Sequence, residues 1–192
     1  MPFTHLHTHS HYSLLDGLPQ IPDLVQKARE YNMRALALTD HGAMYGIIEF
    51  YKKCKEAGIK PILGMEAYIS PYPLSSAQAF SERKRYHLTL LAANNHGYKN
   101  LMKLASIGWL QGFYYKPRID MDALARHGDG LIILSGCMQS EVCALISENK
   151  TGDARKLIAQ FQNITGKENF FLEIQTHSGN VKYGKIRASL IE

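Results

Sequence analysis

The sequence contains no long hydrophobic run. No apolar stretch approaches the ~18 residues that a membrane-spanning helix needs, and residues 1–5 (MPFTH) include neither a basic segment nor an apolar signal core. These absences predict a cytoplasmic protein without a membrane span.

Cysteine is scarce. The chain has three, Cys54, Cys137 and Cys143, with no close CxxC pair and one left over from any pairing. A disulfide scaffold and a four-cysteine zinc site are therefore excluded. Cys54 and Cys143 lie in segments with a helical pattern, where a free cysteine usually serves as a small buried hydrophobe.

Several catalytic signatures are also missing. The sequence has no GxxxxGK[ST] phosphate loop, no GxGxxG fingerprint, no HExxH pair and no GxSxG nucleophile elbow. Nucleotide-loop and serine-hydrolase functions lose support. The net charge of +5 suits an anionic partner such as a nucleic acid or a phosphate ester, although charge alone is a weak indicator.

The 192 residues, 45% of them hydrophobic, suffice for one domain with a sizeable core. Strand-like and helix-like segments alternate along them, which predicts an α/β fold with a mostly parallel sheet, either open or closed into a barrel. The expected strands cover residues 3–9, 35–39, 61–69, 88–92, 131–134 and 170–174. The expected helices follow apolar stripes at 21–28, 44–51, 98–105 and 154–161, the last behind Thr151 as its cap, with a further helix at 181–192.

Two stretches, 70–86 and 112–118, interrupt this rhythm and are expected to be loops. Because a βα series normally continues with another strand, the helix at 181–192 suggests that the chain is a fragment.

The first segment carries the strongest chemical signal. Four of the nine histidines, His5, His7, His9 and His11, occupy every second position, so in a strand they would share one face. An apolar core resists such a face, whereas a metal ion readily takes neutral imidazole nitrogen. We expect at least two of these histidines to bind metal; an exposed histidine-rich edge is the alternative.

Further candidates follow later strands. Asp40 and His41 come where the run 35–38 ends, a usual place for α/β sites, although Asp40 could instead cap the next helix. Glu66 lies inside an apolar run, where a carboxylate needs a cation. Cys137 follows the strand 131–134, and His87 and His177 lie at strand ends. Such a set of N and O donors, with or without the cysteine sulfur, suits two or more hydrolytic metal ions.

These residues resemble the PHP (polymerase and histidinol phosphatase) family, whose motifs here read His7-Thr8-His9, Thr39-Asp40-His41 and Glu66. Longer phrases resemble the branch of the family that forms the N-terminal domain of bacterial replicative DNA polymerases. They are residues 9–17 (HSHYSLLDG), 58–64 (GIKPILG), 112–120 (GFYYKPRID) and 134–137 (LSGC).

The resemblance implies one PHP domain over 1–192, a distorted (β/α)7 barrel with up to three Zn or Mn ions at the carboxyl ends of its strands. The implied ligands are His7, His9, Asp16, His41, Glu66, His87 and Cys137, with Asp40 as a ligand or as a group behind the ligands. The family's late (N)DxH motif is absent, which suggests a domain truncated before its last strand and leaves one metal position incomplete.

The implied activity is metal-dependent phosphodiester hydrolysis of the 3′ to 5′ exonuclease type on a single-stranded DNA 3′ end, with metal-activated water as the nucleophile. The remaining polymerase domains and replisome subunits would be partners, and polymerisation itself would reside elsewhere. Candidate DNA contacts are Arg83, Lys84, Arg85, Lys116, Arg118, Tyr114 and Tyr115, which could equally be ordinary loop residues. Two alternatives stay open: a structural metal module that stabilises the polymerase and contacts partner subunits, and a free-standing phosphatase of the histidinol phosphatase type.

Overall fold

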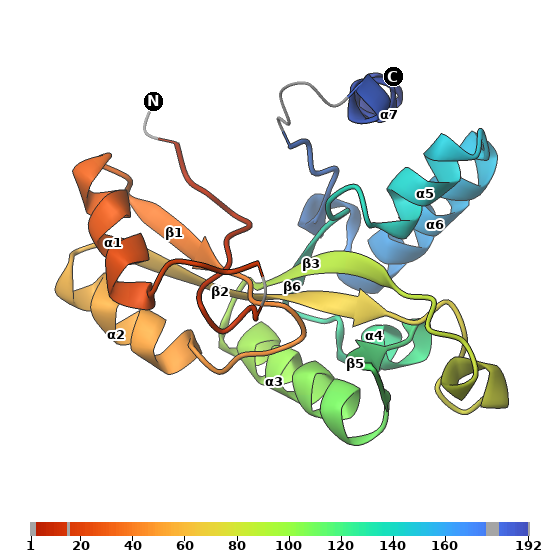
Figure 1. The fold of residues 1–192 in the computed structure, drawn as a ribbon, viewed down its shortest axis with the longest axis horizontal. Coiled ribbons are helices and arrows are strands. Elements are labelled where there is room, and N and C mark those ends of the chain that lie inside the picture. The colour runs from red at the N-terminus through yellow and green to blue at the C-terminus, as the bar shows by residue number, and fades with distance from the viewer. Residues whose placement is uncertain (1–2, 15, 176–180, 192) are drawn as a thin grey trace.

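The computed structural model describes residues 3–14, 16–175 and 181–191. Helices and strands alternate along the chain (Figure 1). In chain order the elements are α1 (Ile21–Glu30), β1 (Ala35–Leu38), α2 (Ile47–Glu56), β2 (Lys60–Ile69), the short 3-10 helix η1 (Ala77–Phe80), β3 (Tyr86–Ala92), α3 (Asn95–Leu110), β4 (Phe113–Tyr114), β5 (Lys116–Ile119), α4 (Met121–His127), β6 (Leu131–Leu134), α5 (Glu141–Ser147), α6 (Thr151–Thr165), η2 (Lys167–Asn169), β7 (Phe170–Phe171) and α7 (Val181–Ile191).

Strand β2 is the centre of the sheet. Within the described part of the chain, seven strands are joined in the order β4-β5-β2-β3-β6-β7, and β1 pairs with β2 as well. Strands β1 and β5 both run parallel to β2, where β1 pairs with residues 60–63 and β5 with residues 68–69. Between these two pairings, an isolated parallel bridge joins His41 to Glu66. The expected α/β architecture is confirmed.

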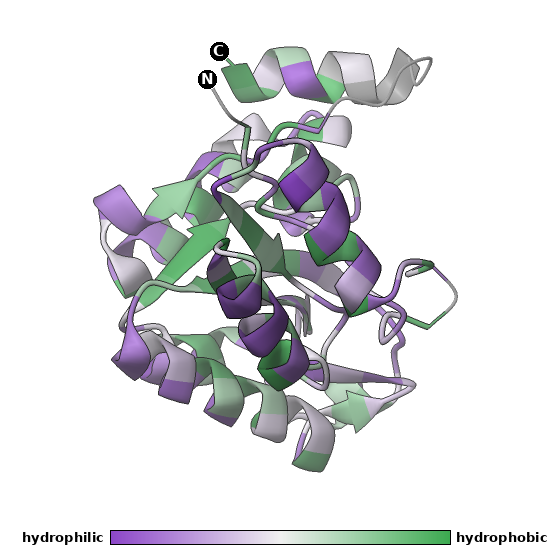
Figure 2. Ribbon diagram, turned by 90° about the vertical axis from the view of Figure 1, so that its left-hand side faces the viewer, coloured by the Kyte–Doolittle hydropathy of each residue, from purple (hydrophilic) through white to green (hydrophobic). Residues whose placement is uncertain are grey.

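Alternation along β2 and β3 separates the core from the site. On one face, Met65, Ala67, Ile69, Leu88 and Leu90 join the main hydrophobic core. That core also takes in Leu101 and Leu104 of α3. Successive strand side chains point to opposite faces, so the polar residues at 66, 68, 87 and 89 share the other face. Figure 2 shows that the strands are largely hydrophobic, whereas the helices are of mixed polarity.

The sheet is mixed, and the expectation of a mostly parallel sheet is wrong. Strand β3 runs antiparallel to both β2 and β6. The physical reason is the connection from β2 to β3, residues 70–85, which contains only the short helix η1 and no full crossover helix. Without such a crossover the chain returns in the opposite direction.

The opening segment is not a regular strand. The carbonyl oxygens of His5 and Thr8 accept hydrogen bonds from the amides of Ala37 and Thr39. From His5 to Thr8 the opening segment thus advances three residues while its partners advance two, an irregularity that breaks the alternation of side chains. The four histidines consequently do not share one face.

Other expectations need smaller corrections. Residues 112–118 are not a loop, because β4 and β5 form a hairpin there around Tyr115, whose φ is 61°. Residues 70–86 include η1 and the first residue of β3. Thr151 is the first residue of α6 and not its cap, a position that Lys150 occupies. The last predicted helix is confirmed as α7. None of the described helices has the length and hydrophobicity of a membrane span.

Candidate metal centre

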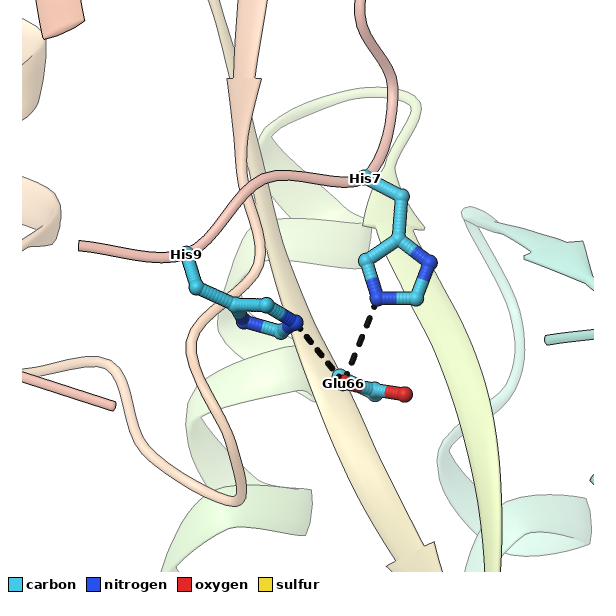
Figure 3. Close-up of side chains that lie close together, drawn as sticks. All are labelled: His7, His9 and Glu66. Carbon is cyan, nitrogen blue, oxygen red and sulfur yellow. Dashed lines mark ion pairs between the residues drawn. The ribbon is translucent and has the colours of Figure 1, made fainter. Parts of the chain in front are cut away.

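Four histidines surround the carboxylate of Glu66, which is only 1% exposed. The Nε2 atoms of His7 and His9 lie 3.2 and 3.1 Å from its Oε2 atom. Figure 3 shows both rings turned from the opening segment toward β2. The two histidines and Glu66 form one group of ligand atoms close enough to hold a metal ion.

A second group uses the same carboxylate. Nδ1 of His41 lies 2.9 Å from Oε2 of Glu66, and Nδ1 of His87 lies 2.8 Å from Oε1. The ligand atoms of His41, Glu66 and His87 are also close enough to hold an ion. Glu66 belongs to both groups, so its carboxylate would serve two metal ions if both groups were occupied.

The chemistry of these side chains fits divalent metal ions. Nδ1 of His41 and Oε2 of Glu66 are buried but make no hydrogen bond of acceptable geometry. Burial raises the pKa of Glu66, yet the histidines at 41, 7, 87 and 9 outweigh it and hold that pKa far below its usual range. A buried, ionised carboxylate among imidazole nitrogens is a donor set that suits divalent metal ions.

Glu173 is a member of the site that sequence reasoning missed. Its Oε1 atom lies 2.6 Å from Nδ1 of His7, and its Oε2 atom accepts a hydrogen bond from Thr89. Burial lowers the pKa of His7, but Glu173 and Glu66 together raise it to about 10. The sequence could have identified Glu173, because it is, like Glu66, a carboxylate within an apolar run.

Asp40 holds the loops behind the metal groups together. Its carboxylate is 2% exposed and accepts hydrogen bonds from the amide and hydroxyl of Ser10 and from the hydroxyl of Ser13, each at 2.7 Å. Ser13 in turn contacts Nδ1 of His9 and accepts a hydrogen bond from the amide of His41. Asp40 does not cap a helix. It supports ligands without reaching their ligand atoms.

The remaining predicted ligands lie at different distances from Glu66. Sγ of Cys137 lies 3.6 Å from its Oε1, and burial raises the thiol pKa to about 12. Asp16 contacts Nε2 of His41 at 2.7 Å from a largely exposed position. His5 contacts the ring of Phe3 and His11 that of Tyr12, rather than Glu66. His177 lies outside the described residues.

Several predicted DNA contacts gather beside the metal groups. The ring of Tyr68 stacks on His41 at 5.7 Å, and the cationic groups of Arg85 and Lys116 each lie 5.6 Å from the same ring. Arg83 packs over the ring of Tyr115 and donates a hydrogen bond to its hydroxyl. Burial raises the pKa of Tyr68 to about 12, so its hydroxyl stays neutral.

Arg118 is different, and its prediction as a DNA contact is wrong. The side chain is fully buried and donates hydrogen bonds to the carbonyl oxygens of residues 79, 82 and 112. It fixes the segment around η1 to the β4–β5 hairpin, which places it out of reach of a nucleic-acid backbone.

A cavity of about 1180 Å³ is lined by residues of β2, β3 and β6 together with His7 and Glu173. Its lining includes Ile62, Leu91, Ile132 and Leu134.

The sequence as a whole supports the same interpretation as the geometry. The family model for the PHP domain matches residues 5–177, which include both metal groups and Glu173. The chain belongs to the PHP domain family. This finding confirms the resemblance drawn from the motifs.

Curated relatives are named DNA polymerase III subunit alpha. The protein of Borreliella burgdorferi is 49% identical over 176 residues, covering 91% of this chain, and that of Treponema pallidum is 42% identical over 193 residues, covering all of it. This PHP domain spans only 15% and 16% of those two proteins. Among solved structures, a protein of Bifidobacterium adolescentis named as a metal-dependent phosphoesterase is 14% identical, with a TM-score of 0.49 over 98% of this chain and 96% of its own.

Proposed function

We propose that this PHP domain binds at least two divalent ions, Zn or Mn, around Glu66 and hydrolyses phosphodiester bonds at a single-stranded DNA 3′ end. The observation that carries the proposal is the buried Glu66 carboxylate shared by two histidine groups. Paired divalent ions in such centres lower the pKa of water and stabilise charge on phosphoryl oxygens. Cys137 and Asp16 would complete the ligand set, with a third ion as its upper limit.

The chain's own residues would bind and orient the substrate. Arg85 and Lys116 flank Tyr68, which stacks on His41, so their charges are placed to hold a phosphate group next to the metal positions. Asp40 and Ser13 hold the loops of His9 and His41 in place. Arg83 and Tyr115 would contact the strand farther from the centre.

The names of the relatives extend the proposal to the whole protein. We propose that the domain forms part of a bacterial DNA polymerase III alpha subunit, contacts its other domains and the replisome subunits, and acts in the cytoplasm. A role in DNA replication follows from that assignment.

A structural role is the second candidate. Residues 3–10, the described part of the opening segment, form no helix or strand and are joined to β1 by few backbone hydrogen bonds. Metal ions held by His7, His9 and Glu66 would fasten this segment to the sheet without any catalysis.

The deciding experiment measures metal content by plasma mass spectrometry and cleavage of 3′-labelled single-stranded DNA on the same samples. The wild type is compared with a His7→Ala, His9→Ala double variant and with His96→Ala, a control on the surface of α3. We expect two or more ions and cleavage, both lost only in the double variant. Metal loss and lowered stability in the double variant, without cleavage by the wild type, would support the structural role.

A further inference from the structure

A row of exposed aromatic rings lies beside the loop that carries His41 and Gly42. The ring centroids of Tyr45 and Trp109 lie 5.9 Å apart, and those of Trp109 and Phe113 lie 5.4 Å apart with nearly parallel planes. Tyr45 is 59% exposed, Trp109 41% and Phe113 50%. We call Tyr45, Trp109 and Phe113 the aromatic row.

The row is physically continuous with the metal centre. Nε1 of Trp109 donates a 2.9 Å hydrogen bond to the carbonyl oxygen of Gly42, the residue after His41. The amide of Gly42 in turn donates to the carbonyl oxygen of Glu66 at 2.8 Å. One residue of the loop therefore connects the row to both metal groups.

Lysines occur on the elements that carry Trp109 and Phe113. Phe113 lies in the β4–β5 hairpin, where its neighbour Tyr114 pairs with Lys116. The sequence of α3, which carries Trp109, includes two lysines and no acidic residue. Exposed aromatic rings beside cationic groups are the combination that binds single-stranded nucleic acids, because bases stack on the rings while cations neutralise the phosphates.

We propose that the aromatic row is a stacking platform for unpaired bases of the strand whose end reaches the metal centre. The inference rests on the proposed function, since it names the single-stranded polynucleotide as the ligand of the same site. Bases stack on the row, and the backbone passes Lys116 and Arg85 toward Glu66. Recognition of this kind is tolerant of sequence because every base offers a flat face.

Trp109 is the only tryptophan of the chain, so its fluorescence reports stacking directly. Chelator-treated chain is titrated with an oligothymidylate and with an abasic oligomer of equal length and charge. We expect saturable quenching by the first, and binding of the second that is weaker by about tenfold and does not quench. Tyr45→Ala and Phe113→Ala each weaken oligothymidylate binding by about tenfold. Tyr31→Ala removes an equally exposed ring at the end of α1 and leaves binding unchanged.

Different results would overturn the hydrolytic function and the stacking role of the aromatic row. If the wild type never cleaves DNA, and quenching by DNA persists in the His7→Ala, His9→Ala variant, the hydrolytic function is overturned and the row is retained. Equal affinity for the abasic oligomer would overturn the row, even where DNA is cleaved. Row variants that change only the association state of the chain, with unchanged DNA binding, would show a protein-binding face and would also overturn it. Circular dichroism verifies that each variant is folded.

Discussion

Oε1 of Glu66 and Nδ1 of His87 lie 2.8 Å apart across two antiparallel strands in which neither residue is the other's direct partner. The register pairs Glu66 with Thr89 and Tyr68 with His87, so the contact is diagonal. Diagonal neighbours on one face of a sheet are within reach of long side chains. The register of β2 and β3 therefore places His87 beside the carboxylate that both candidate metal groups share.

Glu66→Gln should remove metal from both groups at once. The amide keeps the shape of the side chain but not its negative charge. Loss of a residue that only hydrogen-bonds to a metal ligand already lowers metal affinity by about 10- to 100-fold. We expect a loss on the order of 100-fold or more for this shared ligand, measured by competition with a chromogenic chelator. Glu141→Gln, at a partly buried glutamate outside both metal groups, is the control. Full metal retention in Glu66→Gln would contradict its assignment as a ligand of both groups.

Ser13→Ala should loosen the ligands without removing one. The hydroxyl donates to Asp40 and accepts from the amide of His41, and both partners lose a buried hydrogen bond. We expect the free energy of unfolding to fall by about 1 to 3 kcal/mol and metal affinity to fall by about 10-fold or more. Chemical denaturation and metal titration measure the two effects. Ser106→Ala, on an exposed turn of α3, should change neither.

Metal binding should release protons near neutral pH. In the metal-free chain the pKa of His7 is raised to about 10, so its imidazole is protonated at pH 7, whereas a metal ligand must be neutral. We expect release of about one proton or more per chain, and metal loss as the pH falls. Calorimetric titration in buffers of different ionisation enthalpy measures the release. Heats that do not depend on the buffer would show that His7 is not a ligand.

The central part of the site could be predicted from sequence because burial makes polar residues conspicuous. Glu66 stood out within an apolar run, and the spacing of His7 and His9 suggested a shared face. The same reasoning placed His5 and His11 on that face as well, which is wrong, because the irregular pairing of the opening segment with β1 turns these two side chains elsewhere. Glu173 was missed although its run was identified, since nothing in one strand shows which distant segment it will face.

The direction of strands was the main failure in the fold. Hydrophobic periodicity shows that β3 is a strand but is the same for either direction. The β4–β5 hairpin was missed because each strand is short and Tyr115 takes a positive φ that its residue type rarely adopts.

Arg118 and Lys116 should respond in opposite ways to loss of charge. Arg118→Met removes the guanidinium that donates to three carbonyl groups from inside the protein, so the free energy of unfolding should fall by about 2 to 4 kcal/mol. Lys116→Met should leave stability nearly unchanged but reduce the salt dependence of DNA binding by about one unit of slope. Thermal unfolding and DNA binding at several salt concentrations measure both. A reduced salt slope in a folded Arg118→Met variant would restore Arg118 as a DNA contact.

Gly42 is the position at which backbone conformation connects the metal centre to the aromatic row. Its φ is 58°, and a Cβ atom there would lie 2.6 Å from Cγ of Pro117 and 3.1 Å from the ring of Tyr68. Gly42→Ala therefore combines an unfavourable φ with a steric clash, and we expect it to lower the free energy of unfolding by about 2 kcal/mol or more.

Gly58→Ala separates these two causes. Gly58 has a similar φ of 71° but nothing within 4 Å of a Cβ atom, so it should lose only about 1 kcal/mol. Displacement of the 41–42 loop should also weaken metal binding and shift the fluorescence of Trp109 in Gly42→Ala, but not in Gly58→Ala. Equal metal affinity and equal fluorescence in the two variants would mean that Gly42 does not couple His41 to the row.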